Sequence, residues 1–389
     1  MERLYYADCH TRAFEAKVLR CEETAKGFAV VLDRTAFYPE GGGQACDVGT
    51  LNGIPVTDVR EKGEEIVHLC DSPLPVGETV EGVIDWERRF DQMQQHAGEH
   101  IVSGIIHKQY GYHNVGFHVG KDVVTIDFDG PIPAEDLPAI ELAANGAIWE
   151  NLPIRCWYPD QEELPSVPYR RKKDLPWPVR IVQIPGYDTC ACCGVHVKHT
   201  GEIGLIKLLS CVKFHQGVRM EMACGKRALE VFGKVYEQNR QVSQAFSAKL
   251  LETGEAARRM NEMLAQEKFR ANALEKQVFS SVAKEYADKG DVLHFGENLA
   301  PAAVRELADA IASLCGGTAA VFSGSDDRGY SVCLVNRTSD VKELGKKMSD
   351  ALCGRGGGKP GFFQGSVKAA RGEIENFFAQ VVKCFNIIR

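Results

Sequence analysis

The chain begins with short apolar runs separated by turn signals. Runs such as "GFAVVLD" and "EIVHLC" alternate with "PEGGGQ", "LNGIP" and "PLPVGE". Short apolar runs punctuated by Gly and Pro are typical of β-strands joined by tight turns. We therefore expect residues 1–85 to form a small β-barrel, or a sandwich of similar size.

The hydrophobic pattern then changes to a helical period. Five apolar residues recur at the spacing of one helix face: Phe90, Met93, Ala97, Ile101 and Ile105. This spacing predicts an amphipathic helix over residues 86–110. Strand-like runs ("VVTIDFD", "VRIVQI", "IGLIKLLSC", "VRMEMAC") follow around a helix near 134–151. We expect residues 86–224 to form the α/β core of a module whose first part is the β-barrel.

The third stretch, residues 225–287, contains no proline and is dense in Ala, Glu, Lys, Gln and Arg, which indicates long helix. Its heptads are short and broken by Glu267, so a helical hairpin and an intermolecular coiled coil both stay open. Residues 288–389 alternate helical and strand-like runs and contain "CGRGGGKPGFFQGS". They predict a small α/β domain. Residues 225–389 are our candidate for a homodimer contact.

Composition supports a globular α+β multidomain chain. The 389 residues are 44% hydrophobic and 25% charged, enough to bury a core in two or three domains. The N-terminus lacks a basic segment followed by an apolar core, and no apolar run is long enough to cross a bilayer. Fourteen cysteines are scattered along the chain. We therefore expect a cytoplasmic protein with reduced thiols and no membrane contact.

Net charge is −7, which argues against a nucleic-acid partner until its distribution is considered. Lys and Arg number 22 against 33 Asp and Glu in residues 1–224, and 24 against 20 in residues 225–389. The rear of the chain is thus mildly basic, and RNA binding by that part is compatible with the charge.

The segment "QMQQHAGEHIVSG" contains the first candidate chemistry. His96 and His100 are four residues apart on the expected helix, so both imidazoles can reach one metal ion. His107 lies on the same face and is a rival ligand. Read alone, HAGEH fits the H-x-x-E-H pattern of a zinc peptidase, in which Glu99 would be the general base.

A second segment, "YDTCACCGVHVKHTGEIG", changes that interpretation. Cys192 and His196 have a C-x-x-x-H spacing in a glycine-loosened stretch. Together with the two histidines they form a complete tetrahedral N/S set, which suits zinc. Cys190 and Cys193 are alternative ligands. The peptidase hypothesis leaves this segment unexplained.

These segments, in this order, resemble a known family. "DRTAFYPEGGGQACDVG" (33–49), "MQQHAGEHIVSG" (93–104), "VGFHVG" (115–120), "VTIDFD" (124–129) and the C-x-x-x-H with "HTGEIG" are similar to the editing domain of alanyl-tRNA synthetases and to free-standing alanyl-tRNA editing proteins. "GRGGGKPGFFQG" resembles the glycine-rich signature of the domain that ends those synthetases.

The resemblance implies a zinc-dependent hydrolase that acts in trans on mischarged tRNA(Ala), chiefly Ser-tRNA(Ala) and secondarily Gly-tRNA(Ala). Because the editing-like region begins almost at Met1, we expect no aminoacylation activity. The family pattern puts Thr35 at the contact with the serine hydroxyl. It puts four further residues in the pocket wall: Gly41, Gly42, Gly43 and Gln44. The usual C-G-G-T-H appears with Cys193 and Val195, which leaves ligation intact and fine substrate preference open.

Arg355 and Lys359 flank the C-terminal glycines, and the resemblance implies that they bind tRNA(Ala). Two other classes stay in view. One is a non-catalytic, zinc-stabilised tRNA-binding module, since a closed four-ligand site also suits a structural zinc. The other is a phosphodiesterase, but the Asp-His-His tripeptide that such enzymes carry does not occur in the sequence. No catalytic residue is assigned, and we expect Glu99 on the helix surface.

Overall fold

The computed structural model describes residues 1–171, 177–381 and 386–387. Its contacts divide the chain into two compact units, Met1–Val242 and Ser243–Arg389. The finer division into four parts stays a prediction. No helix in the described part of the chain is long and apolar enough to cross a membrane.

The first unit begins with a sheet that closes on itself. Six antiparallel strands form a closed barrel in the order β2-β3-β7-β6-β5-β8. Buried and exposed residues alternate along β8, as expected for strands with one face toward a core. The strands are β2 (Ala13–Thr24), β3 (Gly27–Leu32), β5 (Gly49–Leu51), β6 (Ile54–Lys62), β7 (Glu65–Cys70) and β8 (Thr79–Ile84). Beside them β1 (Glu2–Arg3) pairs with β4 (Arg34–Thr35), and α1 (Leu4–Ala7) follows β1.

Helix α2 (Trp86–Tyr110) has the predicted bounds and clear ends. Its N-cap Asp85 accepts a hydrogen bond from the Arg88 amide, and Gly111 closes the C-terminus in the left-handed conformation at φ 73°. All of residues 92–104 are buried, so the centre of the helix has no solvated face. Glycines permit this packing, since a Cβ at Gly98 would lie 2.3 Å from the Cys224 sulfur.

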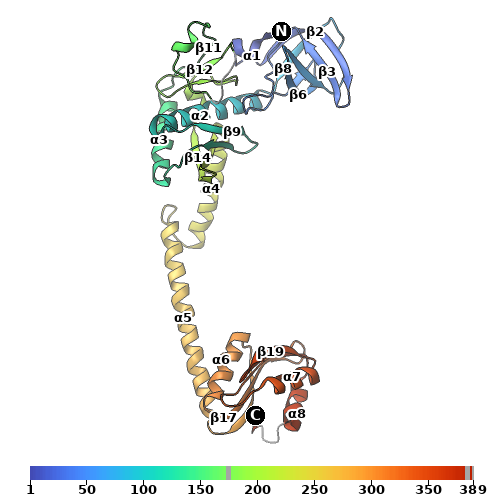
Figure 1. Cartoon of the computed structure of the whole chain (residues 1–389), viewed down its shortest axis with the longest axis vertical. Coiled ribbons are helices and arrows are strands. Elements are labelled where there is room, and N and C mark those ends of the chain that lie inside the picture. The colour runs from blue at the N-terminus through green and yellow to red at the C-terminus, as the bar shows by residue number, and fades with distance from the viewer. Residues whose placement is uncertain (172–176, 382–385, 388–389) are drawn as a thin grey trace. The chain divides into compact units, whose positions relative to one another are not determined.

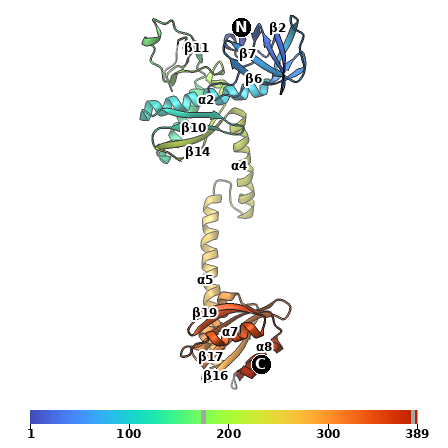
Figure 2. The ribbon, with the colours of Figure 1, turned by 45° about the vertical axis from the view of Figure 1, so that its right-hand side comes forward.

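Two further sheets enclose α2. Figures 1 and 2 show β11 on one side of the helix and β14 on the other. One sheet has the order β14-β15-β10-β9 and the other β11-β12-β13. Their strands are β9 (Asn114–Val119), β10 (Val124–Phe128), β11 (Arg155–Trp157), β12 (Ile181–Ile184), β13 (Asp188–Ala191), β14 (Ile206–Phe214) and β15 (Gly217–Cys224). Helix α3 (Leu137–Trp149) and the 3-10 turn η3 (Thr200–Ile203) also pack on α2. One hydrophobic core runs from the barrel through α2 to these sheets.

The second unit is a six-stranded sheet with helices on both faces, in the order β19-β20-β18-β17-β16-β21. Its strands are β16 (Gly290–Gly296), β17 (Gly316–Ser325), β18 (Gly329–Val335), β19 (Arg355–Lys359), β20 (Phe362–Val367) and β21 (Asn386–Ile387). Helix α6 (Pro301–Ala312) and the end of α5 (Thr253–Glu285) cover one face, and α7 (Lys342–Ala351) and α8 (Arg371–Val381) cover the other. The small α/β fold predicted for this region is therefore present.

The stretch expected as long helix forms two helices, α4 (Gly225–Ala245) and α5 (Thr253–Glu285). Several large apolar side chains of α5 are exposed: Met260, Met263, Leu264, Phe269, Leu274 and Val278. Exposed apolar residues on a long helix are compatible with the predicted contact between two copies, which stays a prediction.

Candidate metal centre

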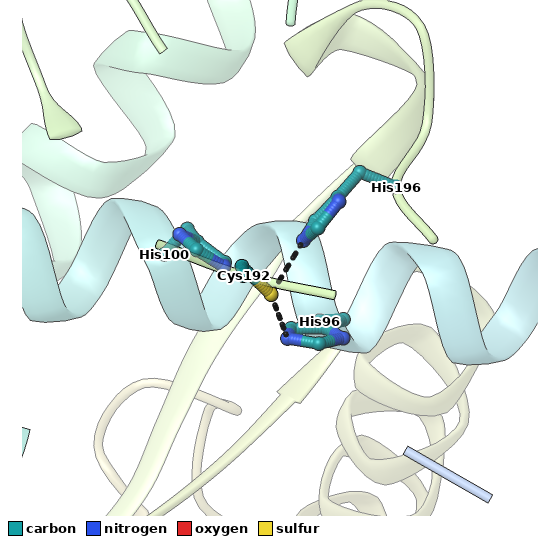
Figure 3. Close-up of side chains that lie close together, drawn as sticks. All are labelled: His96, His100, Cys192 and His196. Carbon is teal, nitrogen blue, oxygen red and sulfur yellow. Dashed lines mark hydrogen bonds between the residues drawn. The ribbon is translucent and has the colours of Figure 1, made fainter. Parts of the chain in front are cut away.

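Four side chains from two distant segments meet at one point. His96 and His100 project from successive turns of α2, and Cys192 and His196 follow strand β13 (Figure 3). The Cys192 Sγ lies 3.4 Å from His96 Nε2 and 3.8 Å from His196 Nε2. One ligand atom from each of the four residues lies within 4.8 Å of every other. The fold therefore brings together the four side chains that the sequence singled out.

Hydrogen bonds behind the rings fix which nitrogen faces the centre. His96 Nδ1 lies 2.9 Å from the Gln44 side-chain oxygen, which also accepts from the Val195 amide at 3.2 Å. Because that oxygen accepts from a backbone N–H, it must also be the acceptor for His96. His100 Nδ1 donates in the same way to Asp188 Oδ2 at 2.8 Å. In the neutral form of each ring, Nε2 then carries the lone pair, as in metal-binding histidines.

Asp188 is held in turn by a guanidinium. Arg170 donates to both carboxylate oxygens of Asp188, at 2.7 and 2.8 Å. Burial alone would raise the pKa of Asp188, but the hydrogen bonds from His100 and Arg170 lower it below its ordinary value. Sequence reasoning did not assign either residue. The only local signal was an aspartate four residues before Cys192, since ligand histidines commonly donate to a carboxylate.

Two of the protonation states suit metal binding, and that of His100 must change. Burial opposes protonation of His100, but the Cys192 thiolate and Asp188 raise its pKa well above 6.5, so this imidazole must release a proton to bind a metal ion. Burial opposes ionisation of the Cys192 thiol, but the surrounding imidazoles of His96, His196 and His100 lower its pKa well below 9.0. Burial lowers the pKa of His196 to about 3, so that imidazole is neutral. The Nδ1 of His196 is buried with no hydrogen-bond partner among the described residues. A buried thiolate facing three imidazoles is a donor set that fits a tetrahedral metal ion.

Two glycines allow the loops to approach the centre. A Cβ on Gly194 would lie 2.1 Å from Cε1 of His96, so only hydrogen fits between the C-x-x-x-H loop and that ring. Gly43 has φ +82°, and a Cβ there would lie 2.5 Å from the Phe117 ring. The glycine-rich loop of the barrel therefore packs directly against β9.

A cavity of about 1120 Å³ opens beside the centre. His96, His100 and Cys192 reach its wall, so the centre is accessible from it. Further lining residues include Arg3, Tyr6, Gly42, Gly43, Glu99, Asn114, Phe117, Tyr158, Arg170, Trp177, Arg180 and Cys193.

The residues expected to contact a substrate take different places. Gly42 and Gly43 line the cavity, whereas Gln44 lies behind His96 and is only 1% exposed. Gly41 is not among the described lining residues. Thr35 is completely buried, with its hydroxyl 2.8 Å from His68 Nε2. Whether these residues contact a substrate stays a prediction.

The expectation for Glu99 is wrong. Its side chain is not on the helix surface but 4% exposed, in the wall of the cavity beside His96 and His100. Its Oε1 accepts hydrogen bonds from the Ser103 hydroxyl and the Asn114 amide. The apolar period of α2 predicts one buried face, but sheets pack on the helix from both sides and bury this position too.

The rival ligands are less well placed. His107 lies outside the four-residue group, with Nδ1 3.0 Å from the Tyr112 carbonyl oxygen. Cys190 belongs to a second group with His100 and Asp188, but Asp188 is already engaged by Arg170. The first group therefore offers the better donor set.

The remaining candidate residues lie in the second unit. Arg355 and Lys359 begin and end β19, an edge strand whose five residues are all exposed. The three residues between them are exposed glycines.

Three family models match the chain. The model described as "Threonyl and Alanyl tRNA synthetase second additional domain" matches residues 179–221, which include Cys192 and His196. The model for class II (A) tRNA synthetases matches residues 4–88, and the DHHA1 domain matches residues 278–386.

Full-length relatives agree with these matches. The chain is 28% identical over 391 residues to the alanyl-tRNA editing protein Aarsd1 of Danio rerio, covering 95% of both chains. It is 30% identical over 392 residues to Aarsd1 of Mus musculus, covering 94% of both. The alanyl-tRNA editing protein AlaX-L of Pyrococcus horikoshii is 36% identical over 245 residues, which are 60% of this chain and 61% of that protein. The resemblance predicted from the motifs is confirmed, and the chain belongs to the family of alanyl-tRNA editing proteins.

Proposed function

We propose that this protein is a zinc-dependent deacylase of mischarged tRNA(Ala), acting chiefly on Ser-tRNA(Ala) and secondarily on Gly-tRNA(Ala). The observation that carries the proposal is the cluster of three imidazoles and one thiol at the wall of a cavity, formed by His96, His100, Cys192 and His196. It occurs in a chain whose relatives are named for alanyl-tRNA editing.

Zinc is the proposed metal because three imidazoles and one thiolate match its preferred ligands and tetrahedral geometry. A bound zinc ion would supply a fixed positive charge and Lewis acidity beside the ester. Gln44 and Asp188 support this role by holding the Nδ1 atoms of the two helix histidines. With four protein ligands in place, we favour a role in positioning the substrate, with water attacking the ester.

Discrimination against alanine is the central demand on such an enzyme. An apolar site built for alanine rejects serine only about 100-fold, because serine is a near-isostere with one added hydroxyl. A second site that hydrogen-bonds the hydroxyl can reject alanine more strongly, since alanine would leave polar groups unpaired. The proposed contact of Thr35 with this hydroxyl rests on the family pattern alone, because its own hydroxyl already bonds to His68.

The second unit is the proposed contact for tRNA. Arg355 and Lys359 place two cations at the ends of the exposed edge strand β19, and the three glycines between them are exposed. Cations beside accessible backbone N–H groups suit RNA phosphates. This contact would hold the tRNA in a way that does not depend on the attached amino acid.

The direct test compares three substrates with the purified full chain. We expect rapid hydrolysis of Ser-tRNA(Ala), slower hydrolysis of Gly-tRNA(Ala) and survival of Ala-tRNA(Ala). Loss of the seryl and alanyl esters at equal rates would contradict the proposed specificity. Survival of all three esters while tRNA(Ala) is bound would favour a non-catalytic module, which the closed four-ligand set also suits.

A further inference from the structure

Glu99 is a carboxylate in a cavity whose other charged groups are arginines and the metal centre. Among the described lining residues it is the one carboxylate, alongside Arg3, Arg170 and Arg180. The proposed function gives this residue no part. Glu99 directly precedes the candidate ligand His100 and lies in the wall of the cavity.

The three arginines are engaged elsewhere. Arg170 pairs with Asp188, and Arg180 donates to the carbonyl oxygens of Cys192 and Gly194 at 2.9 and 2.8 Å. Arg3 pairs with Glu61. In the described part of the chain, no ion pair joins a lining arginine to Glu99. Arg170 is near enough to Glu99 for their charges to interact, but both of its hydrogen bonds go to Asp188.

The hydrogen bonds that described side chains donate to Glu99 all reach one carboxylate oxygen, Oε1. Ser103 and Asn114 both donate to Oε1, and the Asn114 amide also reaches the Ser103 oxygen at 3.3 Å. A carboxylate only accepts, so the Asn114 NH₂ group must face it. The described side chains supply no donor to Oε2. Glu99 is 4% exposed and lies in the cavity wall, so Oε2 is the carboxylate oxygen left for a donor that enters the cavity.

The substrate of the proposed function offers one such group. The RNA itself is a polyanion, which a carboxylate repels, whereas the aminoacyl ester carries an α-ammonium two bonds from the carbonyl under attack. We propose that Glu99 binds the α-ammonium group of the aminoacyl ester through Oε2. Glu99 is thereby a specificity residue that selects esters of free amino acids over N-acylated esters. This inference rests on the proposed deacylase function.

The test changes the charge of Glu99 and the charge of the ligand independently. Wild-type protein, Glu99→Gln and the matched control Glu87→Gln are assayed on Ser-tRNA(Ala) and N-acetyl-Ser-tRNA(Ala). Glu87 is in the first turn of the same helix, with its side chain 89% exposed. We expect Glu99→Gln to lower kcat/KM about 10- to 100-fold for the free ester, as for loss of a charge-assisted hydrogen bond, and to leave the acetylated ester nearly unchanged. Glu87→Gln should match the wild type on both.

A binding measurement separates recognition from catalysis. The probe is 3′-(seryl)amino-3′-deoxyadenosine, a stable amide, together with its N-acetyl form. The dissociation constant of the free-amine probe should rise by a similar factor in Glu99→Gln, and that of the acetylated probe should not. Thermal unfolding and zinc content show whether Glu99→Gln folds. Glu99→Asp keeps the charge and should retain part of the preference for the free amine, so it provides the test if Glu99→Gln folds poorly.

The outcomes are distinguishable. If wild-type protein hydrolyses neither ester, the proposed function fails before Glu99 is tested. If wild-type protein hydrolyses both esters equally, or Glu99→Gln slows both by the same factor, recognition of the ammonium is refuted. Loss of zinc from Glu99→Gln with equal slowing of both esters would likewise overturn the inference and make Glu99 a support of the metal centre.

Discussion

Replacing Gly194 by alanine should disable the metal centre through a single methyl group. The added Cβ would lie 2.1 Å from His96 Cε1, 2.4 Å from His96 Nδ1 and 3.1 Å from the Gln44 oxygen. Because carbon atoms in contact are about 3.5–4.0 Å apart, the His96 ring would have to move by about 1.5 Å. The ring is 2% exposed and lies at the wall of the cavity, so this displacement takes it out of its present position in the cluster.

That movement disrupts two interactions of His96. The His96 Nδ1 hydrogen bond to Gln44 is lost, and Nε2 leaves its place near Cys192. Overpacking a buried site costs about 1–3 kcal/mol of folding stability. Loss of an outer hydrogen bond alone lowers metal affinity about 10- to 100-fold. We therefore expect Gly194→Ala to bind zinc at least about 10-fold more weakly and to lose deacylation in the same proportion.

Competition with a zinc-binding dye measures the affinity, and thermal unfolding measures the stability. Gly233→Ala on α4 is the matched control, because a Cβ there meets no heavy atom within 4 Å. It should bind zinc as the wild type does. Wild-type zinc affinity and activity in Gly194→Ala would refute the close packing on which this reasoning depends.

Three further variants test other contacts of the structure. Asp188→Asn removes the anion that accepts from His100 Nδ1 and should weaken zinc binding about 10- to 100-fold, measured by the same dye competition. An unchanged zinc affinity would show that this hydrogen bond is not needed. Burial lowers the pKa of His68 from 6.5 to about 4, so the unfolded chain takes up its proton first as the pH falls, and stability that is complete above pH 6.5 is lost toward pH 4. This loss is about 2 kcal/mol between pH 7 and 5 and should be missing from His68→Gln in denaturant titrations; identical pH slopes would contradict it. Charge reversal of Arg355 and Lys359 together should weaken tRNA(Ala) binding and reduce its salt slope by up to about two, and an unchanged slope would remove them from the interface.

The cluster of four candidate ligand residues was predictable because the geometry of each pair is local. His96 and His100 are one helical turn apart, and Cys192 and His196 share one short loop, so each pair is fixed by spacing alone. Joining the two pairs required the chemical argument that together they complete a tetrahedral set. The fold places all four ligand atoms in one group.

The supporting residues were not predictable in the same way. Gln44 lies 52 residues from His96, and Asp188 lies 88 residues from His100, and such distances leave no periodic signal. Glu99 shows the opposite failure. Helix periodicity assigned it to solvent, but sheets on both sides of α2 bury residues 92–104. A helix enclosed in this way violates the assumption of one polar face on which the pattern rests.

The proposed metal-dependent editing is tested most directly by zinc content and deacylation measured on the same preparations of wild-type protein and Cys192→Ala. The account predicts about one zinc per wild-type chain with hydrolysis of Ser-tRNA(Ala), and loss of both in Cys192→Ala, because the thiolate is the one anionic ligand of the centre. A Cys192→Ala protein that keeps one zinc per chain and hydrolyses Ser-tRNA(Ala) at the wild-type rate would contradict it.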